Sequence, residues 1–168
     1  MEIINAVVGI IQLVIAIILA VAALYIGFSV LGKITKGIDE EKEIAKGNTA
    51  VGILVASVFI AIGIVVQSGV SGISVGISQA LKAGLLTSLG ITIIIVSVLQ
   101  LLLGIVLAIV AIYLALNILD KLTKGIDEFA ELKKGNVAVA LEMAGVIITV
   151  AIIIQSGVMG ITAALIGA

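Results

Sequence analysis

The chain contains the same sequence twice, with the second copy at a fixed offset of 88 residues. Thr35-Lys36-Gly37-Ile38-Asp39-Glu40 returns at 123–128, and Gln67-Ser68-Gly69-Val70 returns at 155–158. Of the 80 positions that align without a gap, 34 are identical. Such self-similarity indicates a supersecondary unit that is used more than once. We therefore expect one domain made of a first unit over residues 1–83 and a second over residues 84–168.

The chain is too apolar for a soluble domain of its length. Only 11% of its residues are charged, against about 25% in ordinary soluble domains. Its apolar runs, at about 3–31, 48–66, 91–119 and 136–154, match or exceed the ~20 residues that cross a bilayer. Backbone groups in lipid must be hydrogen-bonded within their own segment, which favours helices. We predict an all-α integral membrane protein with four transmembrane helices, as two parallel two-helix repeats.

The lysines predict the orientation. Eight of the nine lie in the polar loops at 33–46 and 121–134, and only Lys82 lies on the opposite side. Because positive charge is retained in the cytoplasm, we expect a plasma-membrane protein with both hairpin loops cytoplasmic and both termini outside. Each unit has an even number of spans, so both should share one orientation about a pseudo-two-fold axis along the membrane normal.

The residue types that the sequence lacks exclude several classes of function. The chain has no His and no Cys, which removes thiolate chemistry and the commonest metal ligand. Without a visible base, its Ser and Thr residues cannot form a nucleophilic constellation. Its net charge of -1 does not resemble a basic nucleic-acid footprint. We expect no enzyme, no catalytic residue, no cofactor, no metal site and no nucleic-acid partner.

The polar loops carry helix-ending and helix-starting signals. Gly37 suits the left-handed position after a helix, Asp39 can cap a short acidic turn over 40–46, and Gly47 can end that turn. Asn48 can then cap the second span. One interpretation is that these residues serve only to begin and end helices. The other is that the loops at 33–47 and 121–135 present matched docking faces to a cytoplasmic protein.

Small residues form stripes along the spans. At 100° per residue they share one face of the first span (Ala16, Ala20, Ala23, Gly27) and of the third (Gly104, Ala108, Ala111, Ala115). Helices associate in lipid through close backbone approach, which small residues permit. We interpret the stripes as helix-packing seams. The same kind of seam runs through the fourth span (Ala138, Glu142, Gly145, Thr149, Ile152, Ser156) and the second (Ala50, Leu54, Ser57, Ala61, Ile64, Ser68).

A few polar residues lie inside the spans. Glu142 is the only carboxylate there, and an intramembrane ionisable group is a functional hypothesis by default. It lies about 9 Å along the helix from Asn136, so it could instead reach the interface or form a structural hydrogen bond. Candidate partners at similar depth are Tyr25, Tyr113 and Asn117. Four amides fall toward the outer leaflet, either as interhelical hydrogen bonds or as part of a pathway: Gln12, Gln67, Gln100 and Gln155.

Two Gly/Ser-containing stretches follow the second and fourth spans. We expect residues 68–84 to connect the two units on the outside. Residues 156–168 are too short to cross the membrane again. They could extend the fourth helix, lie at the interface or re-enter, and we favour extension.

The second hairpin loop resembles a known family. Residues 131–140, Glu-Leu-Lys-Lys-Gly-Asn-Val-Ala-Val-Ala, and 43–50, Glu-Ile-Ala-Lys-Gly-Asn-Thr-Ala, are similar to the signature of the YjfL-like domain-of-unknown-function family. The resemblance covers both repeats. It implies four transmembrane helices in tandem two-helix units, an association with envelope maintenance, and a cytoplasmic partner. It supplies no catalytic residues.

Two functions of different classes remain. The first is a non-enzymatic, self-associating membrane protein with a structural or membrane-maintenance role, which the small-residue seams favour. The alternative is an ion- or proton-translocating subunit that uses Glu142, as in the rotor-ring proteolipids, which the chain resembles in architecture only. The depth of Glu142 and the missing glycine repeats count against this alternative.

Overall fold

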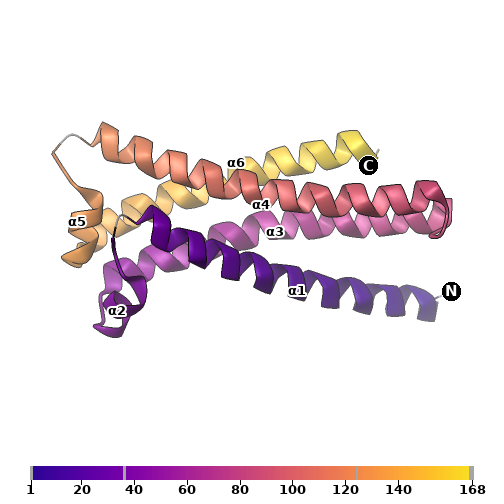
Figure 1. Cartoon of the computed structure of the whole chain (residues 1–168), viewed down its shortest axis with the longest axis horizontal. Helices are drawn as coiled ribbons and strands as arrows, with labels where there is room; N and C mark the ends of the chain where they lie inside the picture. Colours follow the sequence, from indigo (N-terminus) through magenta and orange to yellow (C-terminus); the bar gives the residue numbers. More distant parts are fainter. Residues whose placement is uncertain (1, 36, 124, 167–168) are drawn as a thin grey trace.

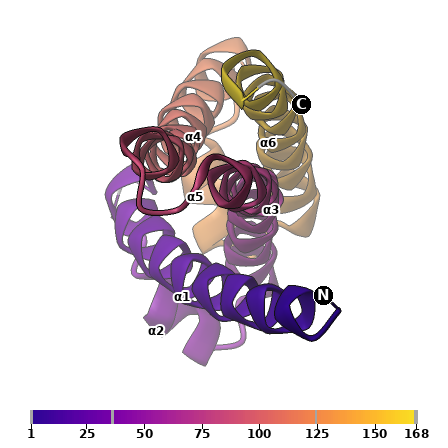
Figure 2. The same ribbon diagram turned by 90° about the vertical axis from the view of Figure 1, so that its right-hand side faces the viewer.

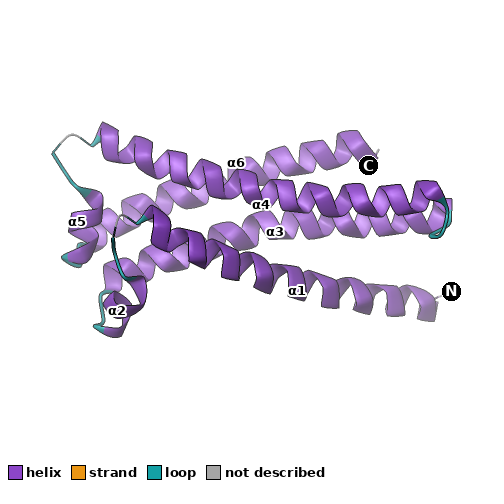
Figure 3. Ribbon diagram, in the orientation of Figure 1, coloured by secondary structure: helices purple, strands orange, loops and turns teal. Residues whose placement is uncertain are grey.

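The computed structural model describes residues 2–35, 37–123 and 125–166, and the regular secondary structure in these ranges is all helical. The first half contains α1 (Glu2–Ile34), α2 (Glu40–Ala45) and α3 (Thr49–Ala83). The second half contains α4 (Ser88–Leu122), α5 (Glu128–Lys133) and α6 (Val137–Ile166). Each half is thus a long, a short and a long helix, as Figure 3 shows.

The four long helices run along the long axis of the molecule. The short helices α2 and α5 lie together at one end, while both termini lie toward the other, where the α3–α4 turn also lies (Figure 1). Within the described residues, four helices are long and apolar enough to cross a membrane. A helix of 35 residues, such as α3 or α4, is about 52 Å long, which exceeds the ~30 Å hydrocarbon core.

The stretch at 68–84 is helical up to Ala83, so the prediction of a connecting segment there is wrong. The glycines of this stretch are packing positions. A Cβ built on Gly69 would lie 2.1 Å from Leu101 Cδ1, and one built on Gly76 would lie 2.0 Å from Ser97 Oγ. Tertiary packing therefore overrides the weak helix propensity of glycine. The C-terminal segment does extend the fourth helix, to Ile166, as we predicted.

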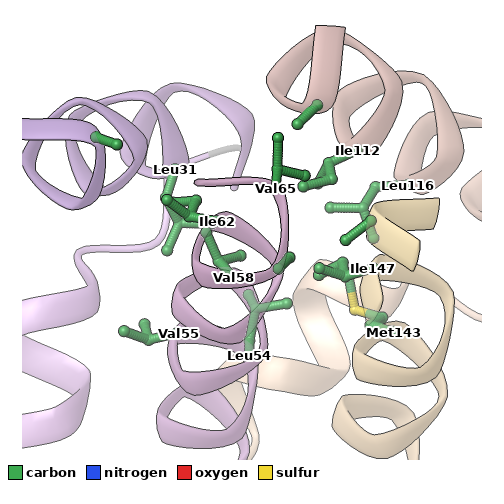
Figure 4. Close-up of a cluster of buried hydrophobic side chains, with 14 of the residues drawn as sticks. Leu31, Leu54, Val55, Val58, Ile62, Val65, Ile112, Leu116, Met143 and Ile147 are labelled. Carbon is green, nitrogen blue, oxygen red and sulfur yellow. The ribbon is translucent and has the colours of Figure 1, made fainter. Parts of the chain in front are cut away.

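Helix α3 is the centre of the bundle and packs against α1, α4 and α6 (Figure 2). Its buried side chains point to three different neighbours (Figure 4). Ile62 lies on the side of Leu31 in α1, Val65 on the side of Ile112 in α4, and Leu54 on the side of α6. The apolar core is therefore arranged around one helix, whereas α1 is mostly uncovered.

The two halves do not pack through equivalent faces. The α3 face that carries Leu54 is buried, but its counterpart on α6, which carries Glu142, is exposed. Likewise Ser57 is buried and Gly145 is exposed. A local two-fold axis would bury equivalent residues equally, since each would make the same contact. The arrangement therefore departs from the expected pseudo-two-fold symmetry, because α3 and α6 meet through different faces.

Candidate functional site

The hairpin ends are built from local signals in the sequence. The Asp39 carboxylate accepts a hydrogen bond from the Lys42 backbone N–H at 3.1 Å and caps α2, and Asn48 Oδ1 accepts one from Val51 N–H at 3.2 Å and caps α3. Gly37 and Gly47 have φ of 82° and 81°, which only glycine adopts readily. The predicted caps and turns are therefore confirmed. Lys36 and Lys124 lie outside the described residues.

Each hairpin end also buries a carboxylate that sequence reasoning missed. The Thr35 hydroxyl donates to Glu40 Oε1, and the Thr123 hydroxyl donates to Glu128 Oε1. Glu128 is 1% exposed and Glu40 is 8% exposed. Buried charges are rare unless they are hydrogen-bonded. The signal is present in the sequence, because threonine and glutamate five residues apart occur in both copies.

One residue joins the two hairpin ends. Asn48 Nδ2 donates to the backbone oxygen of Leu132 at 2.9 Å and lies 3.4 Å from that of Lys133, at the end of α5. It also donates to Glu43 Oε2 at 3.1 Å. The equivalent Asn136 donates to Glu131 Oε2 at 2.8 Å, but in the described structure its Nδ2 reaches no carbonyl of α2. Asn48 of the first half therefore bonds to the second half, and Asn136 makes no equivalent bond to the described residues of the first.

The outer surface of the hairpin ends carries exposed ion pairs. Lys46 Nζ lies 2.7 Å from Glu43 Oε1, and Lys134 Nζ lies 2.6 Å from Glu131 Oε1. The hydrogen bonds from Lys46 and Asn48 hold the pKa of Glu43 below its ordinary value. The pKa of Glu131 is lowered in the same way, first by Asn136 and then by Lys134. These carboxylates stay ionised at neutral pH and order the turns before α3 and α6.

The three glutamine side chains that the structure describes differ in their surroundings. Gln100 is buried, and its Nε2 donates to the Val158 backbone oxygen of α6 at 3.2 Å. Gln67 is exposed and lines a shallow groove between α1 and α3, and Gln155 is half-buried. The side chain of Gln12 lies outside the described part of the structure. Among the described glutamine side chains, Gln100 thus forms an interhelical hydrogen bond, which is one of the two interpretations of this set.

Glu142 lies on the outer face of α6, exposed in the single chain. Its candidate partners are not assembled around it. Tyr25 is 76% exposed, and Asn117 Nδ2 donates to the Tyr113 backbone oxygen at 2.7 Å. The described residues contain no group of three or more His, Cys, Asp or Glu that could hold a metal ion. Glu142 is about 24 Å along α6 from Val158, the residue whose backbone oxygen accepts the hydrogen bond from Gln100.

The predicted seams of the first and third spans face neighbouring helices. The seam predicted for the fourth span does not, because its residues are all exposed in the single chain (Ala138, Glu142, Gly145, Thr149, Ile152, Ser156). A Cβ on Gly104 would lie 3.0 Å from Val158 Cγ2 and 3.7 Å from Val65 Cγ1, at the junction of α4, α6 and α3. A Cβ on Gly27 would lie 1.9 Å from Ile62 Cδ1 of α3. The other residues of the first-span and third-span seams are buried (Ala23, Ala108) or half-buried (Ala16, Ala20, Ala111, Ala115). Close approach of α1 to α3 and of α4 to α6 therefore depends on these small residues.

A family model matches both halves of the chain. It is described as Domain of Unknown Function (DUF350), and it matches residues 5–104 and 93–168. The two matches start 88 residues apart, the offset of the sequence repeat. No curated protein and no solved structure matches the chain. The family that the hairpin motifs indicated is thereby confirmed: the chain belongs to the DUF350 family, whose function is unknown.

Proposed function

We propose that the chain is a non-enzymatic membrane protein that self-associates into a discrete homo-oligomer and has a structural or membrane-maintenance role. The observation that carries this is the outer face of α6. Its small residues Gly145, Gly157 and Gly160 are exposed, and a Cβ on any of them would meet nothing within 4 Å. The equivalent α3 positions Ser57, Gly69 and Gly72 are buried. A face of this kind permits close helix approach in lipid.

Self-association is tested by counting subunits. Protein reconstituted in liposomes at low density, with one fluorophore per chain, should bleach in a fixed number of steps greater than one. Native mass measurement in a mild detergent should give the same number. A strict monomer in both measurements would overturn the proposal. A broad distribution that grows with protein density would also count against a discrete oligomer.

We also propose that both hairpin ends are cytoplasmic and that both units share one orientation. In support, α2 and α5 lie at one end of the molecule, and the α3–α4 turn lies at the other (Figure 1). Because the chain has no cysteine, single cysteines can report their side with a membrane-impermeant thiol reagent. Glu41→Cys and Lys133→Cys, both exposed, should be protected in intact cells. Leu86→Cys, 94% exposed in the α3–α4 turn, should be labelled, and opposite labelling of the two hairpin ends would refute the shared orientation.

The geometry does not favour ion translocation by Glu142. This carboxylate is on the outside of the single chain, and the buried glutamine lies elsewhere, between α4 and α6. A translocation path needs polar groups that line a common cavity. We therefore retain the structural role as the proposal.

A further inference from the structure

The contact between α3 and α4 joins the two halves of one chain and has a defined register. Leu101 of α4 is 0% exposed and lies over Gly69, whose built Cβ would be 3.1 Å from Leu101 Cβ. Closer to the α3–α4 turn, Ser97 lies over Gly76, whose built Cβ would be 2.9 Å from Ser97 Cβ. In both contacts a glycine of α3 receives a side chain of α4.

The repeat-equivalent residues are all present and all uncovered. Leu13 of α1 takes the place of Leu101 and is 59% exposed, and Gly157 of α6 takes the place of Gly69 and has nothing within 4 Å of a built Cβ. They do not meet within one chain, because α3 lies between α1 and α6 (Figure 2). Each chain therefore has both halves of an α3–α4-type contact, on opposite sides of α3.

The second pair of equivalent positions also contains one glycine, but this glycine is on the other helix. Where α3 has Gly76 and α4 has Ser97, α6 has Ala164 and α1 has Gly9. In the α3–α4 pair the glycine is on α3, and in the equivalent pair it is on α1, so in both pairs one partner has no side chain. Both Gly9 and Ala164 are exposed. Each pair thus contains one glycine and one small residue, which permits the same close approach of the two helix backbones.

We propose that α1 of a second copy packs on α6 as α4 packs on α3, so that Leu13 lies on Gly157 and Gly9 lies on Ala164. This rests on the proposed self-association and specifies its interface. The contact joins different surfaces of the two copies, so it is heterologous and leaves a free α6 and a free α1 at the two ends. Such contacts form a closed ring when the rotation between subunits closes, and an open filament when it does not.

A second exposed face fits the same arrangement. Within one chain, Ala144 and Ala151 of α6 are buried on the side of α6 that packs against α3 and α4. Their counterparts on α3, Ala56 and Gly63, are exposed. In the proposed assembly, the α6 outer face of the preceding copy covers this part of α3. One rule of association thus accounts for uncovered faces on α1, α3 and α6.

Cysteine cross-linking tests the register, since the chain contains no cysteine of its own. The Cβ separation of Gly69 and Leu101 is close to the ~3.5–4.5 Å range of disulfides, so Gly69→Cys/Leu101→Cys should form an intrachain bond on mild oxidation with copper–phenanthroline. Leu13→Cys and Gly157→Cys, made in separate chains and mixed in one membrane, should form a cross-linked dimer. Neither variant alone should do so.

The double variant Leu13→Cys/Gly157→Cys separates the possible geometries. Head-to-tail association should give a ladder of multimers that ends at the size of the native oligomer. Cross-linked dimers from a single-cysteine variant alone would show an isologous contact and overturn the proposal. The matched control is Val14→Cys with Gly157→Cys, because Val14 is 50% exposed and its counterpart Leu102 also stays exposed at 47%. Equal yields from the Val14 and Leu13 pairs would mean random collision and would also overturn the proposal.

The result distinguishes this inference from the proposed function. If subunit counting shows a discrete oligomer but the Leu13–Gly157 and Gly9–Ala164 pairs do not cross-link, self-association holds and this interface is wrong. If subunit counting shows a monomer, both fail. All four positions are exposed in the single chain, so the cysteines are not expected to disturb its fold.

Discussion

Asn48 Nδ2 lies 2.9 Å from the backbone oxygen of Leu132, so the residue that caps α3 also binds the end of α5 in the other half of the chain. We predict that Asn48→Ala destabilises the protein more than Asn136→Ala does. Both variants lose a helix cap, which costs about 0.5–2 kcal/mol. Only Asn48→Ala also loses the hydrogen bond to Leu132, which adds about 1 kcal/mol.

Unfolding by SDS in mixed micelles, followed by circular dichroism, measures this difference. Asn136→Ala is the matched control, because its side chain makes the same cap and the same kind of bond to a glutamate of its own turn. Equal losses of stability in the two variants would show that the bond across the halves contributes nothing.

The buried threonine–glutamate pairs lead to a second prediction. Thr35→Val and Thr123→Val keep the shape of the side chain but remove the hydroxyl that donates to Glu40 or Glu128. Leaving a buried carboxylate without this donor should cost about 1–3 kcal/mol each. Thr35→Ser should restore most of the stability. Thr92→Val is the control, because this exposed threonine donates only to the Ser88 backbone oxygen at 2.8 Å, so its loss should change the unfolding midpoint little.

The ionised carboxylates of Glu43 and Glu131 predict that the protein loses stability in acid. The pKa values of Glu43 and Glu131 are lowered from 4.5 by their lysine and asparagine partners. A lowered folded-state pKa means that the stabilisation is present above 4.5 and is lost as the pH falls through the folded-state value. The SDS concentration at the unfolding midpoint should therefore decrease as the pH is lowered from neutral to strongly acidic values. Both carboxylates are half-buried and pair with exposed lysines, so the effect should be small.

The double variant Glu43→Gln/Glu131→Gln provides the comparison. Glutamine does not titrate, so the slope of stability against pH should be shallower below about 4.5. An unchanged slope in the variant would assign the acid sensitivity to other carboxylates. Both measurements should be made at one salt concentration, because exposed ion pairs are screened by salt.

Local features of this fold could be predicted from the sequence because their causes are local. Gly37 and Gly47 have positive φ, and Asp39 and Asn48 bond to backbone within three residues. Apolar run length identified the four long helices in the same way. The family followed from the Lys-Gly-Asn motif and its repetition.

Features that depend on a partner surface could not be predicted this way. From the sequence alone, residues 68–84 are expected to connect the two units beyond the second span, because the sequence does not show that Leu101 packs onto Gly69 and that the segment continues α3. Nor does it show which of four similar glutamines is buried, since Gln100 is distinguished only by the position of Val158 on another helix. The Thr35–Glu40 and Thr123–Glu128 pairs are different, because each pair is local and its spacing is repeated in both copies of the sequence.

The repeat-equivalent glycines Gly69 and Gly157 predict opposite phenotypes for one substitution, glycine to leucine. Gly69→Leu places a side chain where Leu101 already lies, and overpacking of this kind costs about 1–3 kcal/mol or more. Gly157→Leu meets no atom within the chain, so the monomer should keep its stability. In the proposed interface the same leucine would push Leu13 of the neighbour away, so Gly157→Leu should be folded but monomeric. Circular dichroism with subunit counting separates the two outcomes, and an intact oligomer in Gly157→Leu would place the interface elsewhere.

Glu142 occupies the position of Leu54, which is fully buried on the side of α3 that faces α6. If the outer face of α6 is an interface, a carboxylate there weakens association, because an ionised group is costly in an apolar contact. We predict that Glu142→Leu strengthens the oligomer about tenfold, which corresponds to about 1.4 kcal/mol, and that Glu142→Gln has a smaller effect in the same direction. Dilution of the protein in liposomes, with energy transfer between labelled chains, measures the change. Ion flux through the same liposomes should be equal for all three proteins, whereas a flux that only the wild type supports would establish the translocation alternative and assign its site to Glu142.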